Sequence, residues 1–197
     1  MNRCRPAAAM LTAPAPAPAL ALALALALAL ALSLPLAGVA EGAVTASTAD
    51  GFTLVIEVDV KAPPPLAYRE LTVGPAAWWD PEHTYSGKAE RLTLDARAGG
   101  CFCESMDGGA SVSHGTVIYA DPGQMLRLST ALGPLQEMAV VGTLSFAFAP
   151  REAGSHVTLT YRVFGAFTED AVALSKLVDS VLTQQMGRFA AHVNGKD

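Results

Sequence analysis

The chain has 197 residues, of which 51% are hydrophobic and 16% are charged, and its formal net charge is −5 at pH 7. The 13 basic residues are scattered, so the sequence predicts no electrostatic surface for a nucleic acid. Three cysteines are too few for a domain built around a disulfide framework.

The first forty residues have the composition of a secretory signal peptide. Arg3 and Arg5 give a basic start, and an uninterrupted Ala-Leu run covers 19–32. Gly38 and Ala40 then fit the −3 and −1 positions of a cleavage site. We therefore expect a signal peptide over 1–40, cleavage near Ala40, and export to the periplasm or the medium. An uncleaved anchor is the alternative, because about 20 apolar residues can span a bilayer.

Cleavage at that point leaves 157 of the 197 residues, a normal size for one domain with its own core. We expect a short flexible start over 41–50, a single domain over 51–193, and a tail over 194–197. No apolar run in these ranges reaches bilayer-spanning length, so the sequence predicts no membrane contact after cleavage.

The domain begins with a predicted strand and helix. Apolar and polar residues alternate from Phe52 to Val60, as in a half-buried strand. The prolines of 62–65 end this strand and suit the first turn of a helix over about 64–71. A second short helix or turn is expected over 75–79.

Six further strands are expected, each followed by glycine, proline or another turn-forming residue. They cover 88–97, 101–106, 111–120, 125–132, 142–149 and 155–164. The connection over 132–138 is unusually apolar, so we expect either a lid or a plain hairpin crossing. Apolar residues then recur at offsets of three and four from 168 to about 192, which predicts a long amphipathic helix capped by Thr168.

The connections between these strands are of hairpin length, which favours an antiparallel sheet. A single apolar helical stripe can bury one face of such a sheet. The predicted fold class is therefore α+β, with a curved antiparallel sheet of about 6–7 strands wrapped on a long C-terminal helix.

Several stretches resemble, in the same order, the START-like (SRPBCC) superfamily, whose members have the helix-grip fold. These stretches are Ala62–Thr72, the Trp78-Trp79 pair, the Gly99-Gly100 pair with the strand after it, and His114–Val117. The resemblance covers about Gly51 to His192. It is closest to the branch known as activators of the heat-shock chaperone ATPase, or loosely as polyketide cyclase-like proteins.

The resemblance implies a cavity between the sheet and the long helix that holds a hydrophobic or amphipathic small molecule. No motif predicts a cofactor. We do not expect the chaperone-activating role, because an exported protein would not meet a cytosolic chaperone. The chain also lacks a Gly-Lys-Ser/Thr phosphate-binding loop.

Cys101 and Cys103 share one face of their strand because they are two residues apart. If the turn over 107–110 has an even number of loop residues, His114 faces Cys103 and a Cys-Cys-His cluster results. Three interpretations stay open: thiols that only line the core or cavity, a disulfide, and a metal site. A three-residue loop would shift the register and break the cluster.

Four side chains are candidate acid–base groups: His83, Tyr85, Glu104 and His114. Strand alternation places Glu104 on the face opposite Cys103. We therefore expect that Glu104 and His114 do not meet, which argues against an acid–base pair.

The expected function is an exported, non-enzymatic protein that binds a hydrophobic small molecule. The first alternative is a cyclase- or hydrolase-like enzyme that uses His83, His114 or Glu104. The second is a metal- or redox-responsive binder that uses Cys101, Cys103 and His114. The candidate ligand-binding residues are Trp78, Trp79, His83, Tyr85, Cys101, Cys103, His114 and Phe146.

Overall fold

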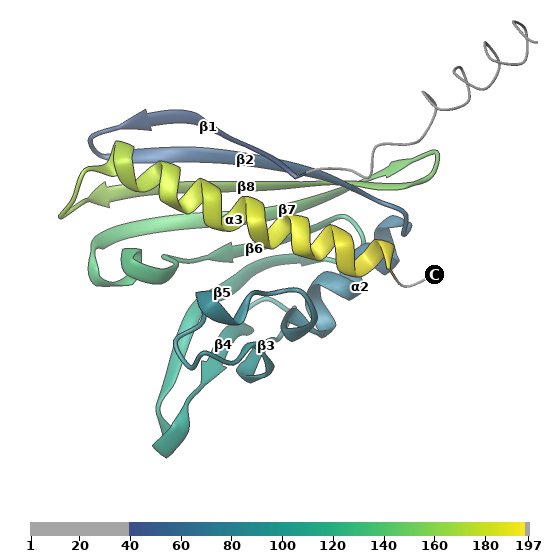
Figure 1. Ribbon diagram of the computed structural model, residues 1–197, viewed down its shortest axis with the longest axis horizontal. Helices are drawn as coiled ribbons and strands as arrows, with labels where there is room; N and C mark the ends of the chain where they lie inside the picture. Colours follow the sequence, from purple (N-terminus) through teal and green to yellow (C-terminus); the bar gives the residue numbers. More distant parts are fainter. Residues whose placement is uncertain (1–39, 196–197) are drawn as a thin grey trace, which may run out of the picture. The chain divides into compact units, whose positions relative to one another are not determined.

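The computed structural model describes residues 40–195 (Figure 1). The predicted signal peptide, except for Ala40, and the last two residues of the predicted tail lie outside the described residues. No helix within 40–195 is both long and apolar enough to cross a membrane.

Within this range, eight strands form one antiparallel sheet in the order β1-β2-β8-β7-β6-β5-β4-β3. The strands are β1 (Glu41–Thr48), β2 (Gly51–Val60), β3 (Leu92–Leu94), β4 (Cys101–Ser105), β5 (Ser111–Asp121), β6 (Met125–Ser129), β7 (Ala139–Arg151) and β8 (Gly154–Ala166). The α-helices are α2 (Pro64–Val73) and α3 (Ala171–Asn194), and the short 3-10 turns are η1 (Pro75–Ala77), η2 (Pro81–His83), η3 (Ala89–Arg91), η4 (Asp107–Gly109) and η5 (Gly133–Glu137).

Helix α3 lies along one face of the curved sheet (Figure 1). This arrangement confirms the predicted α+β class and is the helix-grip fold, with one strand more than the upper end of the expected range. The strand predicted from Phe52 and the helix predicted from Pro64 are confirmed as β2 and α2.

The segment 41–50, predicted as a flexible start, instead contains the edge strand β1. It pairs with β2 in antiparallel register, and a bulge between Val44 and Ala46 interrupts the pairing. Because a bulge changes which side chains point inward, β1 has no regular alternation that sequence inspection could detect. Pairing with β1 satisfies backbone groups of β2 that would otherwise form an open edge.

Several other predicted boundaries differ from the structure, and two of these differences have a clear local cause. The strand expected over 88–97 is reduced to β3, because η3 precedes it and a tight turn begins at Asp95. Helix α3 is capped by Asp170 rather than Thr168, and the Asp170 carboxylate accepts a hydrogen bond from Val172 N at 2.9 Å. Starting at Ala171 places that residue in the core.

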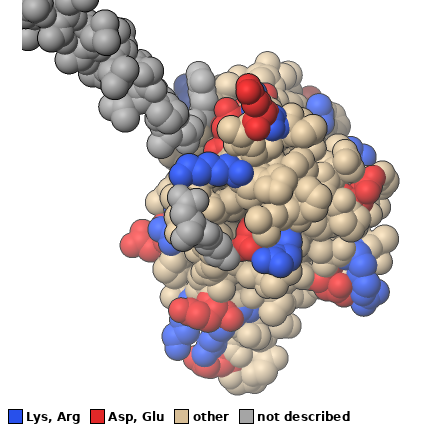
Figure 2. Space-filling model, turned by 90° about the vertical axis from the view of Figure 1, so that its right-hand side faces the viewer, with Lys and Arg blue, Asp and Glu red and all other residues tan. Residues whose placement is uncertain are grey.

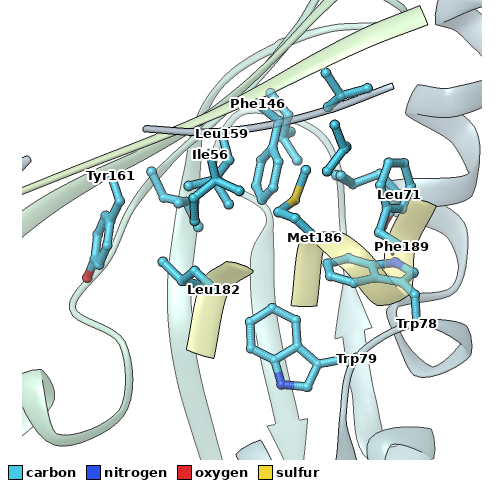
Figure 3. Close-up of a cluster of buried hydrophobic side chains, with 14 of the residues drawn as sticks. Ile56, Leu71, Trp78, Trp79, Phe146, Leu159, Tyr161, Leu182, Met186 and Phe189 are labelled. Atoms are coloured by element: carbon cyan, nitrogen blue, oxygen red, sulfur yellow. Dashed lines mark hydrogen bonds between the residues drawn. The ribbon is translucent and has the colours of Figure 1, made fainter. Parts of the chain in front are cut away.

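The core lies between the sheet and α3, and Figure 3 shows part of it. Sheet, α2, η1 and α3 all contribute buried side chains, among them Ile56, Leu71, Trp78, Trp79, Phe146, Leu159, Leu182, Met186 and Phe189. Trp78 meets Phe189 edge to face, with ring centroids 5.6 Å apart. Such aromatic pairs bury large apolar areas in a defined geometry.

Charged residues are mixed on the face of the domain shown in Figure 2. Lys and Arg side chains stand beside Asp and Glu side chains there, and neither sign gathers into a large patch. One ion pair of the domain joins Arg188 and Asp80, whose side chains lie 3.4 Å apart.

Candidate functional site

A cavity of about 440 Å³ lies beside the N-terminal half of α3. The helix supplies one wall through side chains at offsets of three and four, namely Leu174, Leu177, Val178, Val181 and Leu182. Two short segments, 82–85 at the end of η2 and 132–134 at the start of η5, supply the other walls together with Trp79 and His114. The lining is mainly apolar and the volume suits a small organic molecule.

One polar residue of the lining, His114, belongs to a buried histidine–glutamate pair. His114 Nε2 lies 2.9 Å from Glu104 Oε2, and both side chains are almost fully buried. The carboxylate also accepts hydrogen bonds from Tyr85 N at 3.1 Å and Ser86 N at 2.5 Å. A buried charge that is paired and hydrogen-bonded in this way is tolerated in a protein interior.

The electrostatics of this pair favour an ionised carboxylate. Burial raises the pKa of Glu104, but the hydrogen bonds from Ser86, Tyr85 and His114 outweigh burial and hold that pKa below its usual value. A carboxylate at Oε2 can only accept, so the facing Nε2 of His114 carries a proton.

The expectation that Glu104 and His114 do not meet is wrong. The first cause is the length of the loop before β5. The loop between β4 and β5 has five residues, 106–110, of which Asp107–Gly109 form η4, with Gly108 and Gly109 at φ values of 74° and 84°. An odd loop length pairs Cys103 with Ser113 rather than with His114. The Cys-Cys-His cluster expected for an even loop therefore does not form.

The odd loop already places His114 on the face of Glu104, and a bulge follows at His114 itself. Beyond it, Phe102 pairs with Gly115, so His114 is the extra residue and has no partner on β4. The Thr130 hydroxyl donates a hydrogen bond to the His114 carbonyl and holds the bulged backbone. A Cβ at Gly115 would lie only 2.8 Å from the Thr130 Cβ, so this close approach requires glycine.

Cys101 and Cys103 form a disulfide, with Cα atoms 5.4 Å apart. Of the three interpretations left open by the sequence, the disulfide is the one found. The pair lies on the other face of β4, where Cys101 Sγ is 3.6 Å from Ser113 Oγ, and it does not line the cavity. No group of three or more His, Cys, Asp or Glu side chains within 40–195 is placed to hold a metal ion.

Four of the eight candidate ligand-binding residues line the cavity: Trp79, His83, Tyr85 and His114. The Trp79 indole donates to the His83 carbonyl at 3.0 Å, which holds the η2 turn against the core. The half-exposed Tyr85 donates its hydroxyl proton to the carbonyl of Gly133 at 3.2 Å. This bond links the two short segments across the cavity.

Trp78 and Phe146, in contrast, lie in the filled core. Both border only a small void of about 20 Å³, and the Trp78 indole donates to the Leu71 carbonyl at 3.3 Å. Neither side chain lines the large cavity.

The cavity residues that were not singled out from the sequence come from α3 and the 132–134 segment. The helical residues were visible as an apolar stripe, but a stripe does not show which of its positions face a void. The connection expected as a lid or a plain crossing is a crossing that contains η5. It buries Leu135 completely and lines the cavity with Leu132 and Pro134.

No family model and no curated protein matches this chain. Among solved structures, protein MLL2253 from Mesorhizobium loti is similar with a TM-score of 0.56 and 19% identity, over 74% of this chain and 98% of that one. Protein CV1439 from Chromobacterium violaceum gives 0.53 and 19%, over 72% and 96%. CalU16 from Micromonospora echinospora gives 0.54 and 14%, over 83% and 78%. At such identities the likeness shows the fold alone.

Proposed function

We propose that this chain is an exported, START-like protein that binds a hydrophobic or amphipathic small molecule without covalent chemistry. The observation that carries the proposal is the cavity of about 440 Å³ with its mainly apolar lining beside α3. An apolar guest gains free energy there because both its own surface and that of the lining leave water. The helix-grip fold supports the superfamily but does not select an activity.

Export is part of the same proposal. The basic start, the Ala-Leu run and the small residues before Glu41 support a signal peptide. The Cys101–Cys103 disulfide is compatible with an oxidising compartment, where such bonds persist.

The hydrolase alternative gains some support from the Glu104–His114 contact, because a carboxylate that orients an imidazole is a common general-base arrangement. No serine, threonine or cysteine side chain within 40–195 is hydrogen-bonded to the His114 ring, however. We therefore interpret the pair as part of a binding site.

Blocking the cavity tests the binding proposal. Val178 lines the cavity on α3, so Val178→Trp is expected to fill part of it and to weaken binding of the neutral probe N-phenyl-1-naphthylamine at least about ten-fold. Probe fluorescence titrated with protein measures the affinity. The matched control is Val172→Trp, on the same helix at an exposed position outside the lining, and it should bind like the wild type.

Unchanged probe binding by a folded Val178→Trp protein would refute binding in this cavity. Native mass spectrometry of protein recovered after expression with its first forty residues adds a second test. We expect a chain that begins at Glu41 and carries a non-covalent apolar ligand. A chain of full mass retained in the membrane would contradict the export part.

A further inference from the structure

The imidazole of His114 is held rigidly at the edge of the cavity. Its Nε2 is bound to Glu104, and its ring lies beside Phe102 and Tyr85 with centroid distances of 5.1 and 5.9 Å. Within the described part of the chain, the second ring nitrogen, Nδ1, has no hydrogen-bond partner. A fixed ring with one free nitrogen is therefore part of an otherwise mainly apolar lining.

The protonation of the pair decides what Nδ1 can do. The Glu104 carboxylate accepts from Tyr85 N, Ser86 N and the Nε2 proton of His114. With the proton on Nε2, a neutral imidazole has a lone pair on Nδ1. Nδ1 is then a hydrogen-bond acceptor, and the fixed ring keeps that acceptor in one direction.

The other polar groups in the lining are already engaged or lie at its edge. The Tyr85 hydroxyl donates to Gly133 O, and Thr84 Oγ1 donates to Pro81 O at 2.7 Å. His83 Nδ1 lies 3.5 Å from the buried Gln185 amide, and Glu82 is exposed. His114 Nδ1 is thus the acceptor for which the described residues supply no donor.

We propose that the cavity selects apolar molecules that carry one hydroxyl group, a phenol or an alcohol, and that this hydroxyl donates to His114 Nδ1. This inference rests on the proposed binding function and specifies its ligand class. A ligand without a hydrogen-bond donor would displace water from Nδ1 without replacing its hydrogen bond, and this lowers the affinity. One such bond corresponds to a preference of roughly ten-fold.

Two probes of similar size test the inference on the wild-type protein. We expect 2-naphthol to bind roughly ten-fold more tightly than 2-methoxynaphthalene, whose ether oxygen has no proton to donate. Isothermal titration calorimetry measures both affinities. His114→Phe keeps a ring in the lining but removes Nδ1, so the preference should fall to about one-fold while both probes still bind.

Glu104→Gln gives a readout that a purely structural role would not change. The closer donor, Ser86 N, is expected to keep the glutamine carbonyl at the Oε1 position, so that the amide takes the place of Oε2, gives up the bond from Tyr85 N and donates to His114 Nε2. The imidazole proton must move to Nδ1, which becomes a donor. The variant should therefore lose its preference for 2-naphthol and bind 2-acetylnaphthalene, which only accepts, several-fold more tightly than the wild type does.

The outcomes separate the two proposals. If the wild type binds neither 2-naphthol nor 2-methoxynaphthalene, the proposed function fails. If it binds both equally, the hydroxyl selection is wrong and the apolar binding function stands. A His114→Phe protein that keeps the ten-fold preference would also overturn the assignment to Nδ1, and circular dichroism confirms that each variant is folded.

Discussion

The two halves of α3 face the same sheet but enclose very different space. Along the C-terminal half, Met186 and Phe189 are almost completely buried and pack with Trp78 and Leu71 (Figure 3). Along the N-terminal half, Leu177 is 65% exposed at the cavity edge. We call these regions the filled end and the open end.

The difference lies in what covers each end rather than in the helix. At the filled end, α2 and η1 bring large side chains between sheet and helix, and aromatic rings fill the space. At the open end, η2 and η5 enclose the space without filling it. Gln185 lies between the two ends, where its Oε1 accepts from Asp80 N at 2.8 Å. The molecule thus separates the residues that stabilise it from those that could bind a ligand.

The largest expected effect comes from the filled end. Phe189 is fully buried, so Phe189→Ala should lower the free energy of unfolding by about 3–5 kcal/mol, through lost burial and the cavity it leaves. Urea denaturation followed by tryptophan fluorescence measures the change.

Leu177→Ala is the matched change at the open end of the same helix. Its side chain is mostly exposed, so the unfolding free energy should change by no more than about 0.5 kcal/mol. Losses of similar size for the two variants would show that the open end is packed as tightly as the filled end, which would contradict the comparison.

Glu104→Gln at the open end is expected to lower the unfolding free energy by less than Phe189→Ala does, and in a way that depends on pH. At neutral pH the variant should lose about 2 kcal/mol, because hydrogen bonds to a charged carboxylate are weakened. The folded pKa of Glu104 is depressed, so its contribution is present above the usual glutamate pKa of about 4.3 and is lost as pH falls through the lower folded pKa. The difference in unfolding free energy between wild type and variant should therefore shrink below about pH 4.3.

Unfolding curves at pH 7, 5, 4 and 3 measure this difference. A gap that stays constant down to pH 3 would show that folding does not depress the pKa of Glu104. Glu82→Gln is the control. Glu82 is exposed at the same cavity, no residue within 40–195 binds its carboxylate, and the change should have little effect at any pH.

The same comparison explains how far the sequence could be interpreted. The succession of strands after Phe52, the antiparallel sheet and the long helix follow from turn residues and hydrophobic periodicity, because those signals are local. Trp79, His83, Tyr85 and His114 were chosen for the cavity and do line it. Which α3 positions face a void depends on what the covering segments leave unfilled, and periodicity contains no such information.

The Glu104–His114 contact was missed for a different reason. The odd-length loop, a single-residue change in register, turns His114 from the face of Cys103 to that of Glu104, and the bulge at His114 then shifts the register back by one residue. Both depend on Gly108, Gly109 and Gly115, which the sequence displays but does not assign to a specific turn type. A contact between polar side chains on two neighbouring strands can be predicted only when the register of those strands is known.

A stability loss smaller than those of Phe189→Ala and Glu104→Gln is expected when the disulfide of β4 is removed. Replacing both Cys101 and Cys103 by serine should lower the unfolding free energy by about 1.5 kcal/mol, because the bond closes a loop of only three residues. The inward neighbours on the same strand are Phe102 and Glu104, which hold His114, so the loss should loosen the open end in particular. Amide hydrogen exchange should accelerate in β4 and β5 and remain unchanged at Met186 and Phe189 on α3.

Ser113→Ala, beside Cys101 on the same outer face, is the matched control and should leave exchange unaltered. Equal acceleration at both ends of α3 would mean that the two ends unfold as one unit, and the distinction between them would then be one of packing alone.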